Sequence, residues 1–360
     1  MYLYINKPSH LIQYLVNYAK QVSHIKELYE ISNPTTMKKD KLNIDSFTNM
    51  EGKNYRRSEM LEKEEIGTYF SKKGYEVIEL QQIWRHVHGK LKKDNKIFFL
   101  KMASTPDIGE RTQNETLWNN QIGSLIEKTG VDYFDVPHIY ETGEYEGKFY
   151  YLSTHHDGAM LASKNPPSVG NLEEWIDKII KSNLFFLSLQ RQDLNFRRDQ
   201  DSISSQDKWD EFFQRVQSWY EEVKEHQLQE IFDEVKNLRS TFEPGVNHGD
   251  FVPWHMIQEG EKFILIDGEH ASIQSPRYYD VCYFYHRLYT SAQNPDLAKI
   301  YLGKFRNQLS EEEKNKFDLS IRPILATRII GGFWDAKTDG QEDVAFHNKL
   351  REDFLKNNLF

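Results

Sequence analysis

The stretch Val246–His270 reads VNHGDFVPWHMIQEGEKFILIDGEH and carries the most specific pattern in this sequence. Two short apolar segments flank a turn at Gly260, which predicts a β-hairpin whose first strand begins near His255. Asp250 comes just before this hairpin and Asp267 just after it. Because a hairpin returns the chain to its starting end, we expect both carboxylates and His255 to lie close together. Grouped carboxylates attract a divalent cation, and one without a metal can accept a proton.

Upstream of this stretch, strand-like segments alternate with helical ones. A helix is predicted from about Glu62 to Lys73, and a second over Arg111–Glu127. The polar residues His86–Lys90 predict a turn. The predicted strands are Tyr75–Leu80 with its extension Ile83-Trp84, Lys96–Met102, a short segment at 138–140, and Lys148–Leu152. These elements predict a small, mostly antiparallel sheet that carries one helix.

Past His155 the pattern becomes helical. Helices are predicted over about Leu172–Arg191 and Lys208–Glu225, where apolar residues recur at helical spacing. Helical pattern returns from Pro276 to the end, with a turn expected at Gly331-Gly332. The order of elements predicts an α+β chain with two lobes, the first over residues 61–154 and the second, helical lobe over residues 155–360. Residues 1–60 are expected to form an N-terminal extension that is partly helical or loose.

Composition narrows the class of protein further. The 360 residues include 46 Lys+Arg and 55 Asp+Glu, which gives a formal net charge of −9. Nucleic-acid-binding proteins usually present a net basic face, so no nucleic-acid partner is expected. The acidic balance suits a cationic or metal-bound small substrate, although charge alone does not select one. The single cysteine, Cys282, excludes a disulfide framework and a cysteine-based zinc site within one chain.

The sequence gives no sign of a membrane partner. Its longest apolar runs, such as Asn183–Leu189, are far shorter than the roughly 20 residues that a spanning helix needs. The N-terminus lacks a basic start followed by an unbroken apolar run, so no signal peptide is predicted. Mean hydropathy is −0.73, but 22 Phe, 20 Tyr and 7 Trp argue against disorder. A cytoplasmic globular protein is the expectation, and these patterns do not set its oligomeric state.

The central motif resembles that of a known family. His-Gly-Asp at 248–250, then Pro253, a hairpin and Ile-Asp-x-Glu at 266–269 is similar to the aminoglycoside phosphotransferase and choline kinase family. Tyr150–Thr154 resembles the strand that leads into that family's nucleotide hinge, and Asp280 resembles an aspartate that braces its catalytic loop. The resemblance covers about residues 65–350. It implies a protein-kinase-like fold with a nucleotide-binding N-terminal lobe, and ATP-dependent transfer of phosphate to a hydroxyl of a small molecule.

The resemblance also implies roles for individual residues. Lys101, at the end of Phe98–Lys101, resembles the family's phosphate-binding lysine, and Glu115 stands where the family has the glutamate that pairs with it. Asp250 is then the base that accepts the proton of the substrate hydroxyl, and Asp267 is a metal ligand. The implied cofactors are ATP and Mg²⁺, because phosphoryl transfer depends mainly on positioned phosphates and neutralised charge. A lysine in an open cleft is expected to matter for ATP binding and little for folding.

His255 departs from the family pattern. The family usually has an asparagine at this position, as the second metal ligand. Imidazole matches Mg²⁺ poorly and softer divalent metals better. Three explanations stay open: an altered second metal site with His255 as its ligand, a metal such as Mn²⁺, or a water in place of the ligand. The loop after the first strand also lacks the Gly-x-Gly-x-x-Gly of protein kinases and holds only Gly89.

Three functions fit these residues. The first is an ATP-dependent small-molecule kinase, and the second is a degenerate kinase fold that binds nucleotide or a partner without catalysis, which His255 favours. The third is a metallohydrolase, for which the candidate ligands are His248, Asp250, His255, Asp267 and His270. A hydrolase does not need the strand lobe with its lysine, so the kinase is the favoured interpretation. The acceptor is expected to be a hydroxylated small molecule.

Two further residues of this stretch need an interpretation. His248 is expected to brace the loop through hydrogen bonds. Glu269 is either close to the metal or a surface carboxylate.

Overall fold

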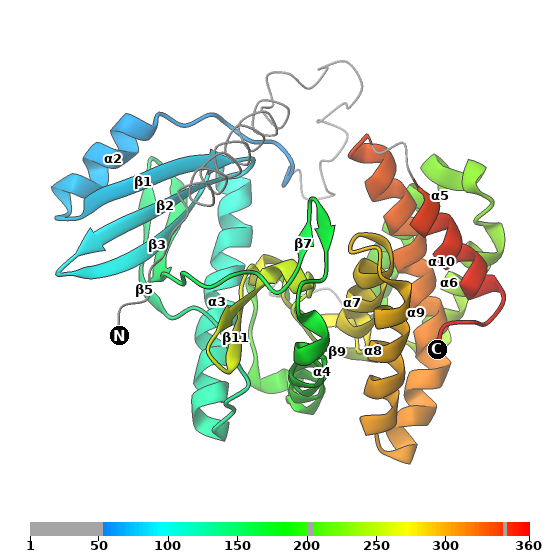
Figure 1. Cartoon of the computed structure of the whole chain (residues 1–360). Coiled ribbons are helices and arrows are strands. Elements are labelled where there is room, and N and C mark those ends of the chain that lie inside the picture. The colour runs from blue at the N-terminus through cyan, green and yellow to red at the C-terminus, as the bar shows by residue number, and fades with distance from the viewer. Residues whose placement is uncertain (1–52, 200–204, 341–343) are drawn as a thin grey trace, which may run out of the picture. The chain divides into compact units, whose positions relative to one another are not determined.

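The computed structural model describes residues 53–199, 205–340 and 344–360 (Figure 1). The chain divides into two compact units, Met1–Thr48 and Asn49–Phe360, and every described residue belongs to the second unit. The predicted extension over residues 1–60 therefore lies mostly outside the described residues.

The first part of the described chain is a five-stranded antiparallel sheet in the order β1-β2-β3-β6-β5. Its strands are β1 (Glu76–Ile83), β2 (His86–Lys93), β3 (Lys96–Ala103), β5 (Ile139–Tyr145) and β6 (Lys148–Thr154). The helices α2 (Lys63–Lys72) and α3 (Pro106–Thr129) accompany it. Ile66 and Phe70 of α2 pack into a core with Leu91, Leu100 and Tyr150 of the sheet. The predicted small antiparallel sheet is confirmed.

The predicted turn at His86–Lys90 is wrong, because these residues belong to strand β2. The chain turns earlier, at Trp84-Arg85, where Trp84 has a φ of 49°. Only Val87 and Leu91 of β2 are large, buried and apolar, so the strand looks polar in the sequence. Gly89 also reads as a turn residue, but here it admits a close neighbour: a Cβ built on it would lie 2.7 Å from the Leu80 side chain of β1.

The second part of the described chain is mainly helical. Its long helices are α4 (Leu172–Ser188), α5 (Ser205–Val223), α6 (Gln229–Thr241), α7 (Tyr279–Thr290), α8 (Pro295–Gln308), α9 (Glu311–Thr338) and α10 (Ala345–Leu355). Helix α6 was not expected from the sequence. Short strands lie among the helices: β9 (Pro244–Asn247) pairs with β12 (Ser272–Pro276), and β10 (Met256–Glu259) forms the predicted hairpin with β11 (Lys262–Leu265).

The turn predicted at Gly331-Gly332 is also wrong, because both glycines lie inside α9. They serve close packing instead. A Cβ on Gly332 would collide with the His286 ring of α7, and a Cβ on Gly331 would lie 3.2 Å from the Trp219 ring of α5. The two glycines therefore allow neighbouring helices to approach α9 where larger residues would hold them apart.

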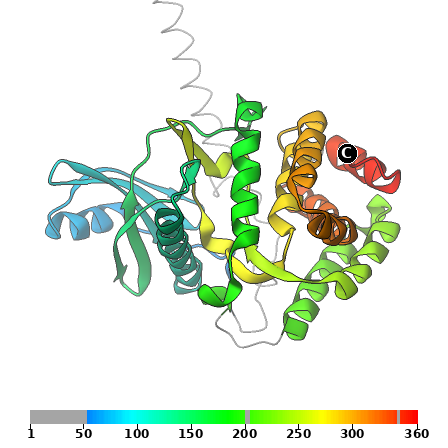
Figure 2. The ribbon, with the colours of Figure 1, turned by 90° about the horizontal axis from the view of Figure 1, so that it is seen from below.

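The elements form two lobes joined near the hairpin. Figures 1 and 2 both show the sheet with α3 on one side, helices α5 to α10 on the other, and α4 with the hairpin between them. Strand β11 also pairs in parallel with β4 (Phe134–Asp135), which follows α3, so the hairpin is tied to the sheet lobe. This α+β arrangement confirms the predicted fold class. β6 ends at Thr154, and the exact lobe boundary at 154/155 stays a prediction.

None of the described helices is long and apolar enough to cross a membrane.

A pair of buried histidines between α7, α9 and α10 predicts a pH dependence of stability. His286 and His347 lie with ring centroids 5.7 Å apart. Burial, followed by the nearby Arg287 and Arg328 guanidinium groups, holds the pKa of His286 well below 6.5, and burial lowers the pKa of His347 to about 4. Below about pH 6.5 the unfolded chain binds protons that the folded chain does not.

The free energy of unfolding should therefore fall as the pH falls from 7 through the range set by these lowered pKa values. Urea unfolding at a series of pH values measures this slope. His286→Asn, which removes one titrating group and stays neutral, should make the slope shallower. A slope unchanged by His286→Asn would contradict the assignment of a buried neutral histidine.

Candidate active site

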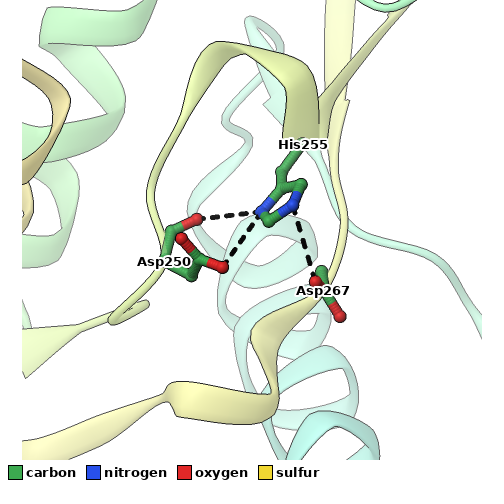
Figure 3. A group of neighbouring side chains, drawn as sticks. All are labelled: Asp250, His255 and Asp267. Atoms are coloured by element: carbon green, nitrogen blue, oxygen red, sulfur yellow. Dashed lines mark hydrogen bonds and ion pairs between the residues drawn. The ribbon is translucent and has the colours of Figure 1, made fainter. Parts of the chain in front are cut away.

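Asp250, His255 and Asp267 lie together at the open end of the hairpin, as predicted (Figure 3). His255 stands between the two carboxylates: its Nε2 lies 3.5 Å from Asp267 Oδ2 and its Nδ1 lies 3.7 Å from Asp250 Oδ2. The Nδ1–H donates to the backbone carbonyl of Asp250 at 3.1 Å. Because Nδ1 is engaged in that bond, Nε2 is the ring nitrogen that faces Asp267.

The loop that carries Asp250 is held by Asp280, at the start of α7. The Asp280 carboxylate accepts hydrogen bonds from the backbone N–H groups of His248, at 2.6 Å, and Gly249, at 2.9 Å. Gly249 has a φ of 84°, and a Cβ on it would collide with the backbone of His270, so only glycine fits there. The expected brace is present, and it fixes the backbone position of the residues directly before Asp250.

His248 is fully buried beside this brace. Its ring lies edge-on to Trp118 of α3, with centroids 5.2 Å apart, and its Nδ1 accepts from the backbone N–H of Asp250 at 3.4 Å. Burial lowers the pKa of His248 to about 4, so the imidazole is neutral. These contacts support a structural role for His248.

Lys101 joins the two lobes electrostatically. From β3, its Nζ lies 2.6 Å from Glu115 Oε2 of α3 and 2.6 Å from Asp267 Oδ1. Glu115 also accepts the backbone N–H of Asp267 through Oε1 at 3.1 Å. Two carboxylates that are 14 and 166 residues away from Lys101 in the sequence thus contact its ammonium group. The predicted ion pair between Lys101 and Glu115 is confirmed.

The charges of this group are set by burial and by each other. Burial lowers the pKa of Lys101, but the Asp267 and Glu115 carboxylates outweigh burial and hold that pKa well above its ordinary value. Burial raises the pKa of Asp267, but the Lys101 ammonium outweighs it and the pKa ends below its ordinary value. Lys101 and Asp267 therefore stay charged, as a site for phosphates and a metal ion requires.

Glu269 and Arg85 complete the cluster, and the sequence did not single out Arg85. Glu269 is buried, so its interpretation as a surface carboxylate is wrong. Its Oε1 lies 2.6 Å from Arg85 Nη2, in the turn between β1 and β2, and its Oε2 lies 3.8 Å from Lys101 Nζ. Arg85 and Glu269 are 184 residues apart, so no local pattern could reveal this pair. It holds the β1–β2 turn over the site.

The carboxylates provide two overlapping groups that could hold a divalent cation. Asp250, His255 and Asp267 offer ligand atoms that all lie within 4.8 Å of one another, and so do Glu115, Asp267 and Glu269. Glu115 and Glu269 are already engaged by Lys101 and Arg85, at 2.6 Å each. The group with His255 is more accessible and offers two carboxylates and an imidazole, so it fits a divalent ion best.

Comparison with known proteins identifies the class. A family model described as "Phosphotransferase enzyme family" matches residues 90–313, which is more than half of the chain. The chain therefore belongs to this phosphotransferase family. No curated protein matches it.

Solved structures show the same fold. One is a thermostable mutant of aminoglycoside phosphotransferase APH(4)-Ia in complex with ADP and hygromycin B, with a TM-score of 0.53 and 13% identity over 82% of this chain and 99% of that one. The same enzyme with AMP-PNP and hygromycin B gives a TM-score of 0.55 and 12% identity, covering 81% and 98%. A GDP complex of an aminoglycoside 2'-phosphotransferase-IIIa mutant gives 0.53 and 13%, covering 81% and 96%. At such identities the likeness establishes the protein-kinase-like fold.

Proposed function

We propose that this chain transfers the γ-phosphoryl group of ATP to a hydroxyl group of a small molecule. One observation carries the proposal: the Lys101 ammonium lies 2.6 Å from both Glu115 and Asp267, and Asp250 stands on the other side of His255 from Asp267. The site thus holds a cation suited to phosphates next to a carboxylate suited to a metal, and a second carboxylate suited to accept a proton beyond His255. Membership of the phosphotransferase family supports the reaction type.

Lys101 and Glu115 are proposed to hold the nucleotide. The ammonium is a compact positive charge suited to phosphate oxygens. Glu115 fixes its position from α3, and also holds Asp267 through the backbone N–H. The phosphates would therefore meet a cation and a metal-binding carboxylate that are positioned by the same glutamate.

Asp250 is proposed to accept the proton of the attacking hydroxyl. Its carboxylate is 24% exposed, so an acceptor molecule can reach it. Neither carboxylate oxygen of Asp250 is closer than 3.7 Å to His255, and its backbone is held through the neighbouring bonds to Asp280. A fixed backbone with a free carboxylate is what a positioned base needs.

Asp267 and His255 are proposed to hold the divalent ion, which leaves the Asp250 carboxylate to accept the proton. When bound there, such an ion supplies positive charge that offsets the charge of the phosphates. Asp267 Oδ2 and His255 Nε2 would face it, while Asp267 Oδ1 stays with Lys101. The imidazole favours an ion softer than Mg²⁺, such as Mn²⁺.

Replacement of His255 tests the altered metal site. His255→Asn offers a hard carbonyl oxygen in place of the imidazole, so apparent affinity for Mg²⁺ should rise by about 10-fold, a common scale for changes around metal sites. ATP turnover measured against Mg²⁺ and Mn²⁺ concentration gives both affinities. A preference between the two metals that is the same in His255→Asn and the native chain would show that His255 does not shape the site.

The alternative is a degenerate kinase fold that binds nucleotide or a partner without transfer. ATP consumption over a panel of hydroxylated metabolites and aminoglycosides, with Mg²⁺ and Mn²⁺ in parallel, separates the two functions. The proposed enzyme should consume ATP when one acceptor is added. Nucleotide binding without turnover under every condition would favour the alternative.

A further inference from the structure

Three arginines gather in the helical lobe. Arg287 comes from α7, Arg328 from α9 and Arg215 from α5. Tyr279, Tyr283 and Arg287 are spaced four residues apart and share one face of α7. That face begins beside the loop that carries Asp250. Its first residue, Tyr279, is followed by Asp280, which accepts hydrogen bonds from the backbone N–H groups of His248 and Gly249.

The side chains on this face contact one another. Arg287 Nη2 donates to the Tyr283 hydroxyl at 3.1 Å and lies 2.6 Å from Asp335 Oδ2 of α9. Arg328 Nη1 donates to the Tyr279 hydroxyl at 3.1 Å, and its guanidinium lies over the Tyr283 ring at 4.3 Å. The two tyrosine rings stack, with centroids 5.8 Å apart. Two guanidinium groups are therefore held in fixed positions by hydroxyl and ring contacts.

Arg215 extends this group from the neighbouring helix. Its guanidinium lies 5.6 Å from the centroid of the Trp219 ring. Gly331 of α9 brings that tryptophan close to Arg328, since a Cβ on Gly331 would lie 3.2 Å from Trp219 and 3.4 Å from Arg328 Nη1. Burial lowers the pKa of Arg215, the charge of Arg198 lowers it further, and Arg328 adds a smaller effect in the same direction.

Positive charge exceeds negative charge in this group. Asp335 is the carboxylate shared by Arg287, at 2.6 Å, and Arg328, at 3.7 Å. Within the described ranges Arg215 makes no ion pair, and the exposed Glu211 on the same helix is the carboxylate that acts on it electrostatically. The Nε atoms of all three arginines are buried and donate to no described atom. Buried cations of this kind are costly unless an anion meets them.

The group also lies within electrostatic reach of the proposed base. Burial and then, among others, the Asp250 carboxylate raise the pKa of Tyr283. The pKa of Arg287 is raised against the effect of burial by Tyr283, Asp335 and Asp250. The face of α7 that carries Tyr283 and Arg287 begins beside the loop of Asp250, so an acceptor that presents a hydroxyl to Asp250 would extend its other groups toward these arginines.

We infer that Arg215, Arg287 and Arg328 bind an anionic group of the acceptor, so that the acceptor is a hydroxylated acid bearing a carboxylate or a phosphate. This rests on the proposed phosphotransferase function and names its substrate class. The net charge of −9 suits a cationic or metal-bound substrate but does not by itself select one. The local charge beside Asp250, and not the total charge of the chain, meets the acceptor.

A matched set of compounds tests the inference. D-gluconate carries a carboxylate, D-glucose 6-phosphate carries a phosphate, and D-glucitol is a neutral relative of both. Choline and hygromycin B are the cationic members. Each is tested at matched ionic strength for ADP formation with ATP and Mn²⁺ or Mg²⁺, and for a shift of the melting temperature with and without AMP-PNP. At least one anionic compound should raise the melting temperature or be phosphorylated, and the two anions together show which group is preferred.

Arg215→Gln is the main variant, because Arg215 has no protein hydrogen bond to lose among the described residues. It should raise the KM or Kd for the anionic compound by about 10-fold or more, the scale of one lost charged hydrogen bond, and leave the KM for ATP unchanged. Arg215→Lys should recover part of the loss. Arg306→Gln is the matched control, since Arg306 pairs with Asp318 at the surface of α8 and α9.

Several results would overturn the inference. It fails if D-glucitol, choline or hygromycin B binds as well as the anions, if neither anion produces a shift or turnover, or if Arg215→Gln responds to anions as the native chain does. Failure of the proposed function looks different: AMP-PNP with metal would then give no shift, or no acceptor would be phosphorylated. The thermal shift without AMP-PNP still tests the arginines in that case.

Discussion

Replacement of Asp250 by asparagine should reduce phosphoryl transfer by about 100-fold or more, while ATP binding stays close to that of the native chain. The change removes the proton acceptor and keeps the size of the side chain. The structural contacts of residue 250 involve its backbone, which accepts from His255 Nδ1 at 3.1 Å, so the loop should keep its shape. Lys101 and Asp267 remain to hold the nucleotide and the metal.

Steady-state turnover and a thermal shift with ATP and metal measure the two parts of this prediction. Asp177→Asn is a suitable control, because Asp177 is an exposed carboxylate that pairs with Lys304 on the surface. Equal turnover in Asp250→Asn and in the native chain would show that Asp250 is not the base. Loss of ATP binding together with turnover would mean that Asp250 holds the metal instead.

Replacement of Lys101 by methionine should remove most of the ATP-induced thermal shift and also destabilise the folded chain. The expectation of an exposed lysine in an open cleft is wrong, and with it falls the reason for expecting little effect on folding. Lys101 is only 5% exposed and lies 2.6 Å from two carboxylates, Glu115 and Asp267. Its removal leaves the buried Glu115 and the partly exposed Asp267 without their cation, and breaking a buried pair costs about 3–5 kcal/mol.

Urea unfolding without nucleotide measures the loss of stability, and a thermal shift with ATP and Mn²⁺ measures binding. Lys262→Met is the matched control, because Lys262 pairs with Asp135 in a partly exposed position where an ion pair contributes little. A Lys101→Met chain as stable as the native one would contradict the buried pair. Whatever its stability, a Lys101→Met chain that still shows the full ATP-induced thermal shift would contradict the role of Lys101 in binding phosphates.

The parts of the site that are close in sequence could be predicted from it. Asp250, His255 and Asp267 are joined by a hairpin, and hairpin geometry alone places them together. Lys101 and Glu115 lie on different elements, and only the resemblance to a known family connected them with Asp267. Glu269 belongs to the Ile-Asp-x-Glu motif, but Arg85 is 184 residues away from it and matches no motif, so no local pattern could predict their contact.

The arginines of the helical lobe were missed for a similar reason. Arg215, Arg287 and Arg328 come from three helices, and each looks like an ordinary helix residue in its own segment. The fold brings them together through Gly331, which reads as a turn in the sequence but lies inside α9. The same ambiguity of glycine affected β2, where Gly89 marks close packing against Leu80 and not a turn. Tertiary packing determined these positions, and local pattern could not show it.

The transfer itself can be measured most directly with ATP labelled at the γ-phosphate. The native chain and Asp250→Asn are incubated with labelled ATP, Mn²⁺ or Mg²⁺, and the panel of hydroxylated compounds, and the products are separated. The native chain should move label from ATP to an organic compound, at least about 100-fold faster than Asp250→Asn. Label that never leaves ATP for any acceptor with either metal, in a chain that binds ATP, would contradict the phosphotransferase and leave a nucleotide-binding protein without catalysis.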